Sequence, residues 1–457
     1  MPVTRAVDTG MMTAMAIEDE QEQVVGDEPA FRHLLVNTLV SGVTSSFLWF
    51  ALTFWAYLET RSVVATAVIG AAFSLSSAVF APWFGTYVDH HRKHQAMALA
   101  TSVFVAVDAG TLLRLRSPWF WLLVALTLLG SVAGSLRGIA MGTCVTLLVP
   151  EPARDKANGM VGSITGVSFA VTSVFSGLVI GQLGMGWALY GALALTVGCL
   201  LHLRTIRIDE PEPTPPAEGE SHKHLDIGAA IEAVKAVPGL SLLIALAAFN
   251  NLLGGVFMAL MDAYGLALVS VETWGLLFGF ISLSFIAGGL VVAKYGLGKD
   301  PLRLIILGNL ANWTVCSVFA LQNSIVPLTI GMVIWLGMIP VVEAAEQTVL
   351  QRAIPFERQG RVFGFAQLVE NAAAPVTAIL MGPLAERVFM PFMTDGGGAD
   401  AIGSWFGTGP ERGLALMFTL AGLIGIVVTV GARTSRAYLR LHTSWSAAPP
   451  EVIPAAG

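Results

Sequence analysis

The stretch LSLLIALAAFNNLLGGVFMALM, residues 240–261, contains neither an acidic nor a basic side chain. A helix needs about 20 predominantly apolar residues to cross the roughly 30 Å hydrocarbon core of a bilayer. In that core every backbone polar group must be satisfied within the segment, which an α-helix achieves. The stretch therefore predicts a transmembrane helix.

Eleven further runs of this kind are spread over the chain. Apolar residues make up 55% of the sequence and charged residues only 12%, whereas a soluble domain carries about 25% charged residues. The fold class is therefore an all-α membrane protein with twelve transmembrane helices in two six-helix bundles. The spans are predicted near residues 33–58, 62–87, 95–114, 119–145, 158–182, 186–206, 240–262, 272–293, 302–321, 325–349, 362–384 and 412–432.

The distribution of Lys and Arg residues over the loops predicts the orientation. Cytoplasmic loops of membrane proteins carry an excess of these residues. With both termini in the cytoplasm, 19 of the 25 fall on the inner side, and Arg137 lies within a span. The outer segments then hold only Arg61, Arg114, Arg116, Arg387 and Arg412.

Five segments follow from this layout. A Pro- and Glu-rich stretch at 209–221 cannot pack a core and reads as a flexible linker, and residues 225–237 have the spacing of an amphipathic helix. The predicted segments are an acidic cytoplasmic tail at 1–31, an N-terminal bundle at 32–206, a linker with an amphipathic helix at 207–238, a C-terminal bundle at 239–441 and a cytoplasmic tail at 442–457.

The loop between the second and third spans reads GTYVDHHRKH at residues 85–94. It resembles the loop signature of the major facilitator superfamily, a Gly followed by an Asp four residues on and then a basic cluster, although Arg92 replaces the family's second Gly. In that family the Asp caps and charge-pairs at cytoplasmic helix ends and locks one state of alternating access. The resemblance thus implies a conformational-switch loop with Gly85, Asp89, Arg92 and Lys93.

The second half keeps a different part of the same pattern. Residues 289–296, GLVVAKYG, retain the second Gly but carry Ala293 in place of the Asp, as expected for diverged repeats. The loops that begin at Pro150 and Pro355 also parallel each other. The run QGRVFG at 359–364 resembles the twelve-span efflux branch with macrolide and siderophore exporters, whereas the Gly-Pro element of proton antiporters is missing from span 5.

Two ionisable residues, Asp108 and Arg137, are predicted to lie about equally deep in neighbouring spans, ~20 Å from their cytoplasmic ends. Such residues are costly in hydrocarbon and are candidates for function by default. The region around Arg137 also resembles the superfamily's span-4 arginine motif, which is associated with proton coupling. Two interpretations stay open: a buried pair whose protonation is linked to transport, and a static ion pair that fixes packing.

Three carboxyl groups fall in spans 10 and 11, which line the central cavity in the resembled superfamily. Glu343 and Glu370 are predicted to carry protons or to attract a cationic substrate. The alternative interpretation of Glu343 and Glu370 is a structural role. Glu346 is predicted to lie in the headgroup region and to pair with Arg352 or Arg358.

Amides and large apolar side chains inside the spans complete the predicted site. They suit an amphiphilic ligand, while Asn side chains can equally hold helices together and Trp side chains can anchor span ends. The substrate-cavity candidates are Asn250, Asn251, Met258, Asn371, Phe50 and Trp55.

Other functional classes find no support in the sequence. Cys144, Cys199 and Cys316 lie in apolar runs without metal-ligand spacing, so no metal and no cofactor is expected. A phosphate-binding Gly-Lys-Ser/Thr loop is missing, which excludes an ATP-driven pump within this chain. A basic patch for nucleic acid is also missing, and we expect no enzyme.

The sequence therefore predicts secondary active efflux of a small amphiphilic compound or drug by alternating access, with the proton gradient as the energy source. The expected partners are this substrate, protons and membrane lipids, for a monomer in a bacterial cytoplasmic (inner) membrane. Two alternatives stay open, namely an importer of a small metabolite on the same fold and a transporter-like sensor without turnover.

Overall fold

The computed structural model describes residues 27–60, 63–114, 120–183, 185–210 and 227–447. In these residues the regular secondary structure is helical, and twelve helices are long. The first half contributes α2 (Glu28–Thr60), α3 (Val63–His90), α4 (Lys93–Arg114), α5 (Phe120–Leu148), α6 (Arg154–Leu183) and α7 (Met185–Thr205). The second half contributes α9 (Leu240–Leu268), α10 (Val271–Tyr295), α11 (Pro301–Val318), α12 (Ile325–Ala353), α13 (Gln359–Leu384) and α16 (Pro410–Thr434).

The predicted fold class is confirmed. Each predicted span coincides with one long helix to within a few residues. Seven segments of the described part of the chain meet the length and hydropathy needed to cross a membrane. The apolar runs located the helices because a bilayer imposes one length and one polarity on every spanning segment.

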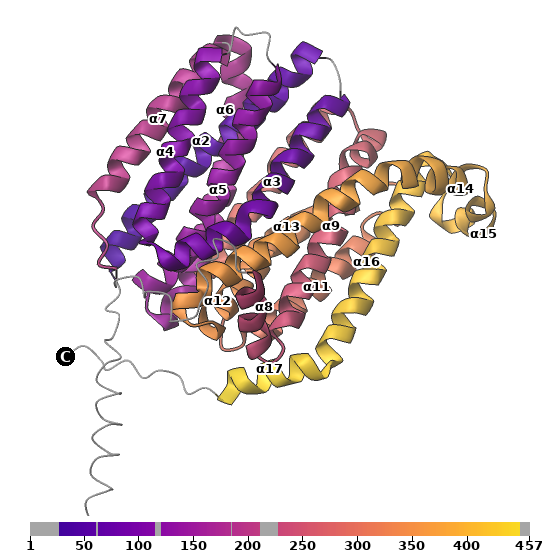
Figure 1. Cartoon of the computed structure of the whole chain (residues 1–457). Helices are drawn as coiled ribbons and strands as arrows, with labels where there is room; N and C mark the ends of the chain where they lie inside the picture. Colours follow the sequence, from indigo (N-terminus) through magenta and orange to yellow (C-terminus); the bar gives the residue numbers. More distant parts are fainter. Residues whose placement is uncertain (1–26, 61–62, 115–119, 184, 211–226, 448–457) are drawn as a thin grey trace, which may run out of the picture.

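The long helices form two bundles that are inclined to each other (Figure 1). They lie closest near the end at which the chain passes from α7 to α8, and we call this the linker end. Between the bundles, α3 packs on α13 and α6 packs on α10. An apolar cluster joins the bundles at the linker end and includes Val88 and Leu136 from the first half and Leu350 and Val362 from the second.

Side chains and special residues at the ends of the second-half helices define where these helices start. Ser270 and Ser324 accept hydrogen bonds from the first-turn amides of α10 and α12, and Asp300 does the same for α11, which begins with Pro301. At its other end, α10 stops at Gly296, whose φ of 73° is readily adopted only by glycine.

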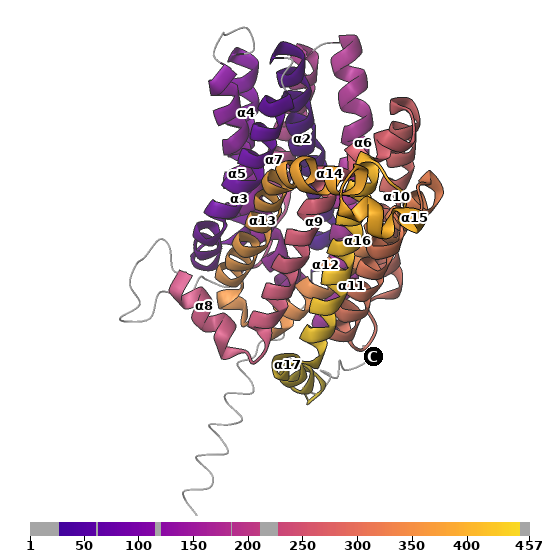
Figure 2. The ribbon, with the colours of Figure 1, turned by 90° about the vertical axis from the view of Figure 1, so that its right-hand side faces the viewer.

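Short helices fill the connections. Helix α8 (Ile227–Ala236) lies within the predicted amphipathic stretch and packs its apolar side against α13. Helix α17 (Arg436–Ala447) lies beneath the second bundle (Figure 2), where the sequence predicted the end of a bundle and a tail. Two single 3-10 turns, η1 (Glu151–Ala153) and η2 (Phe356–Arg358), precede α6 and α13.

The connection between α13 and α16 is largely helical. It consists of a π-helical turn, η3 (Ala385–Phe389), followed by α14 (Met390–Thr394) and α15 (Gly397–Phe406). Arg412, predicted in an outer segment, is only 1% exposed. It donates hydrogen bonds to the carbonyls of Phe406 and Leu321 and to the Tyr264 hydroxyl. The guanidinium thus satisfies buried backbone carbonyl groups that would otherwise need hydrogen bonds from water.

Candidate functional site

The carboxylate of Asp89 joins the two bundles at the linker end. It lies in the last turn of α3 and accepts hydrogen bonds from the amides of Gly360 (2.6 Å) and Arg361 (3.0 Å) and from Nε of Arg361 (2.8 Å). The Asp89 side chain is 1% exposed. These amides belong to the first turn of α13, where unpaired N–H groups and the helix dipole favour a negative charge.

Glycines allow the backbones of α3 and α13 to approach each other at this contact. A Cβ atom added to Gly85 would lie 2.2 Å from the Gly360 carbonyl oxygen, and one added to Gly364 would lie 2.3 Å from that of Ala81. A Cβ at Gly360 itself would lie 2.5 Å from Oδ1 of Asp89. Any side chain at these positions would therefore separate the helices.

The two basic residues of the predicted switch loop do not pair with Asp89. Arg92 is exposed. Lys93 is buried, and its Nζ lies 4.8 Å from the centre of the Phe356 ring on the opposite bundle. The amides of Lys93 and His94 donate to the carboxylate of Glu210, a residue that the sequence analysis did not single out.

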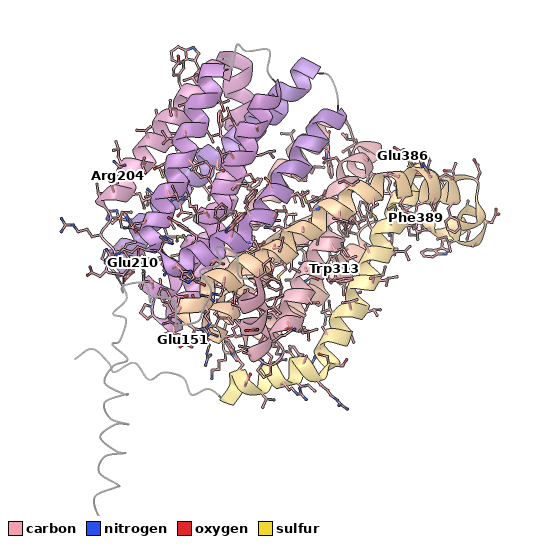
Figure 3. All side chains as sticks on the ribbon, in the orientation of Figure 1. Glu151, Arg204, Glu210, Trp313, Glu386 and Phe389 are labelled. Atoms are coloured by element: carbon pink, nitrogen blue, oxygen red, sulfur yellow. The ribbon has the colours of Figure 1, made fainter. Side chains whose placement is uncertain are left out.

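Further polar contacts cross between the bundles on the way inward from the linker end. Glu151, labelled near the base of Figure 3, forms an ion pair with Arg352 at 2.8 Å. Asn158 donates to Thr348 and to Gln351, each at 2.9 Å. Deeper still, the Ser135 hydroxyl donates to Oε1 of Gln367 at 2.7 Å.

Directly beyond this last contact, three carboxyl groups lie together between α12 and α13. Glu370 follows Gln367 by one helical turn, and its carboxyl group is close enough to that of Glu346 for the two to interact electrostatically. Glu343 is close enough to both to interact electrostatically, and its side chain is exposed. The three carboxyl groups therefore form one cluster.

The cluster has no basic partner among the described residues. One carboxyl oxygen each of Glu346 and Glu370 is buried without a hydrogen-bond partner. The prediction that Glu346 pairs with Arg352 or Arg358 in the headgroup region is therefore wrong. Glu346 is only 9% exposed, and Arg352 is already engaged by Glu151.

The predicted ion pair between Asp108 and Arg137 is not formed. Asp108 accepts a hydrogen bond from the Thr196 hydroxyl at 2.8 Å, whereas Arg137 donates to Thr101 at 2.7 Å and to Oδ1 of Asn37. The partner of Arg137 on α4 is Thr101, seven residues and about 10 Å along the helix from Asp108, so the two side chains do not meet. Both residues are buried inside the first bundle.

The predicted cavity residues are found in different environments. Asn250 accepts a hydrogen bond from Nε1 of Trp313, labelled in Figure 3, and so ties α9 to α11. Asn251 is exposed on α9, as is Met258 at 77%. Asn371 is half-buried next to Glu370. The side chains of Phe50 and Trp55 lie outside the described part of the structure.

In the described residues there is no group of three or more His, Cys, Asp or Glu side chains placed to hold a metal ion.

The sequence profile of the Major Facilitator Superfamily matches residues 34–378. The chain belongs to the major facilitator superfamily. The resemblance of the loop at 85–94 had led to the same family, and that prediction is confirmed.

This chain is similar to Macrolide efflux protein A of Streptococcus pyogenes. The two are 23% identical over 375 residues, which cover 78% of this chain and 90% of the relative. The protein of the same name from Streptococcus pyogenes serotype M6 matches with the same identity and coverage.

Solved structures of other transporters share the fold. FucP in its outward conformation matches with a TM-score of 0.69 at 11% identity, over 89% of this chain and 99% of the other. The human organic anion transporter MFSD10 matches with a TM-score of 0.67 at 15% identity, over 87% of this chain and 99% of the other. A bacterial homologue of ferroportin, in an outward-facing state with soaked iron, gives 0.65 at 15% identity, over 89% and 99%.

In this superfamily member, several contact residues between the bundles escaped the sequence analysis. Glu151 and Asn158 lie in the loop and helix start that the sequence had already paired with the segment after Pro355. That internal parallel was the available signal, because segments at equivalent places in two repeats meet equivalent partners.

Proposed function

We propose that this superfamily member is a secondary active transporter that exports a small amphiphilic compound by alternating access and uses protons as the coupling ion. One observation carries the proposal. The carboxyl groups of Glu343, Glu346 and Glu370 gather directly beyond the closed contact between the bundles, without a basic partner among the described residues. Unpaired carboxyl groups in a membrane protein are costly and are kept where protons or cations bind.

In this proposal the structure represents the state of the transport cycle in which the linker end is closed. We take the bundles 32–206 and 239–441 as the moving units, connected by the segment 207–238, within a single chain that acts as a monomer. We take the linker end to lie in the cytoplasm of a bacterial cell, with the protein in the cytoplasmic membrane; the positive charges of the loops at this end support the orientation. The contacts of Asp89 then close the cytoplasmic side, and the carboxyl groups are reached from outside.

Proton binding and substrate binding would compete in this arrangement. From outside, protons neutralise Glu370 and its neighbours. After the cytoplasmic side opens, the protons leave, and the carboxylates attract the cationic end of an amphiphile. Exposed apolar side chains such as Met258 accommodate the apolar remainder, since methionine adapts to varied ligand shapes. The efflux direction is supported by the similarity to Macrolide efflux protein A.

A ligand-induced thermal-shift screen on the purified protein tests the substrate class. Cationic amphiphiles should raise the unfolding temperature in proportion to occupancy, whereas sugars and amino acids should not. Stabilisation by hydrophilic nutrients alone would contradict efflux. Proteoliposomes loaded with a pH dye then test coupling, because the binding compound should drive proton movement that ceases in Glu370→Gln. An unaltered proton signal in this variant would contradict the assigned coupling site.

A further inference from the structure

The second half of the chain lacks the switch aspartate, since Ala293 stands where the first half has Asp89. The structure nevertheless has a carboxylate at the corresponding contact, between α6 and α10. Asp155, in the first turn of α6, accepts a hydrogen bond from the amide of Leu297 at 2.9 Å. Leu297 directly follows the end of α10 on the opposite bundle.

The internal repeat shows how this carboxylate relates to Asp89. Aligning Pro150 with Pro355 places Asp155 opposite Gly360, the residue whose amide binds Asp89. In the first contact the acid, Asp89, lies at the end of α3, and the amide belongs to Gly360 at the start of α13. In the second contact the acid, Asp155, lies at the start of α6, and the amide belongs to Leu297, just after the end of α10.

The local backbone is shaped around the Asp155 carboxylate. Gly296 has a φ of 73°, and a Cβ atom added to it would lie 2.5 Å from Oδ2 of Asp155. The other carboxylate oxygen accepts from the Lys156 amide at 2.6 Å. One turn along α6, a Cβ atom on Gly159 would lie 2.6 Å from the Ala293 nitrogen, so the two helices also approach closely here.

We propose that Asp155 is a second positioning residue of the alternating-access cycle, which replaces the missing aspartate of the second-half signature and closes the linker end together with Asp89. The inference deepens the proposed function and rests on its alternating-access step. Each carboxylate binds an amide of the opposite bundle only while the linker end is closed. Opening this end therefore breaks both contacts, one on each side of the bundle interface.

A spin-label distance measurement in proteoliposomes tests this role without substrate or gradient. Labels at Arg204→Cys, exposed at the end of α7 (Figure 3), and at Arg303→Cys, exposed at the start of α11, report opening of the linker end. The three native cysteines are buried, so the labels report on the introduced sites. Because no substrate and no gradient is applied and all variants are compared at one pH, the result is independent of whether export or proton coupling is correct.

Asp155→Asn should raise the ratio of open to closed linker ends about threefold to tenfold, as expected for loss of a charge-assisted hydrogen bond. Combination with Asp89→Asn should multiply the two ratios, since the contacts are separate. Glu357→Gln, which removes an exposed acid at the same end, should leave the ratio unchanged. An unchanged ratio in Asp155→Asn would overturn the proposal. A lower unfolding temperature without a shift in distance would overturn it as well, because it would indicate a purely structural role.

Discussion

Oδ1 of Asp89 lies 2.6 Å from the amide nitrogen of Gly360, on the other bundle. This relationship depends on two properties of the pair. The aspartate supplies a charge at the N-terminus of α13, and the glycine leaves room for it, because a Cβ at Gly360 would lie 2.5 Å from the same oxygen. The linker end is thus closed by a contact that both charge and backbone shape control.

Gly85→Ala should prevent this closure. The added Cβ would lie 2.2 Å from the carbonyl oxygen of Gly360, so α3 and α13 must separate and Asp89 must lose its amide partners. We expect the closed fraction at the linker end to fall at least about tenfold, corresponding to loss of ~1.4 kcal/mol or more. The label pair at positions 204 and 303 measures this fraction.

Gly138→Ala is the matched control for this substitution. Gly138 is also a helix glycine of the first bundle, but no atom lies within 4 Å of an added Cβ. Alanine is favoured over glycine in helices by up to ~1 kcal/mol, so this variant should be as stable as the parent or more stable. Equal label distances in the two variants would contradict the role of the close approach at Gly85.

Glu370→Gln should abolish substrate-driven proton movement while preserving the fold. The carboxyl group has a buried oxygen without a hydrogen-bond partner. A neutral Gln side chain avoids the free-energy cost of burying an unpaired charge, and no basic residue loses a partner. We expect unfolding temperatures equal to or above those of the parent and at least about tenfold slower proton movement. Glu386→Gln, at an exposed acid, serves as the control. A marked loss of stability would instead indicate a structural carboxylate.

Asp108 and Arg137 should behave as independent residues. Asp108→Asn weakens the bond to Thr196 and should cost about 1 kcal/mol, whereas Arg137→Gln disturbs the bonds to Thr101 and Asn37. In a double-mutant cycle on the unfolding free energy, we expect a coupling below ~0.5 kcal/mol. A coupling of several kcal/mol would show that the two charges interact directly.

Arg412→Ala should destabilise the second bundle strongly. The buried guanidinium satisfies the carbonyls of Phe406 and Leu321 and stacks 4.2 Å from the centre of the Phe406 ring. Its removal leaves buried acceptors unpaired, at ~1–3 kcal/mol each. Thermal unfolding in detergent should show a clear loss. The exposed Arg387→Ala, on the same connection between α13 and α16, should change the midpoint little.

Sequence reasoning was most successful where the bilayer sets the rule. The span positions and the family could be predicted, because each depends on a single short stretch of sequence. The spans follow from the length and polarity of each apolar run, and the family follows from the spacing of Gly85 and Asp89. Proximity of Glu343 to Glu370 was inferred only from the resemblance, which assigns their spans to one cavity. The predicted partner of Glu346 was wrong, because the neighbouring residues in the sequence do not distinguish a carboxylate in the headgroup region from one that faces a neighbouring helix.

The sequence by itself determined a twelve-helix, two-bundle chain with a charged loop at residues 85–94 in its first half. Only the tertiary structure decided which side chains meet, because pairing depends on the rotation of each helix about its axis, on its position along that axis and on backbone approach. That is why Asp108 bonds to Thr196 rather than to Arg137. It is also why the carboxylate missing at Ala293 is found on another helix, at Asp155.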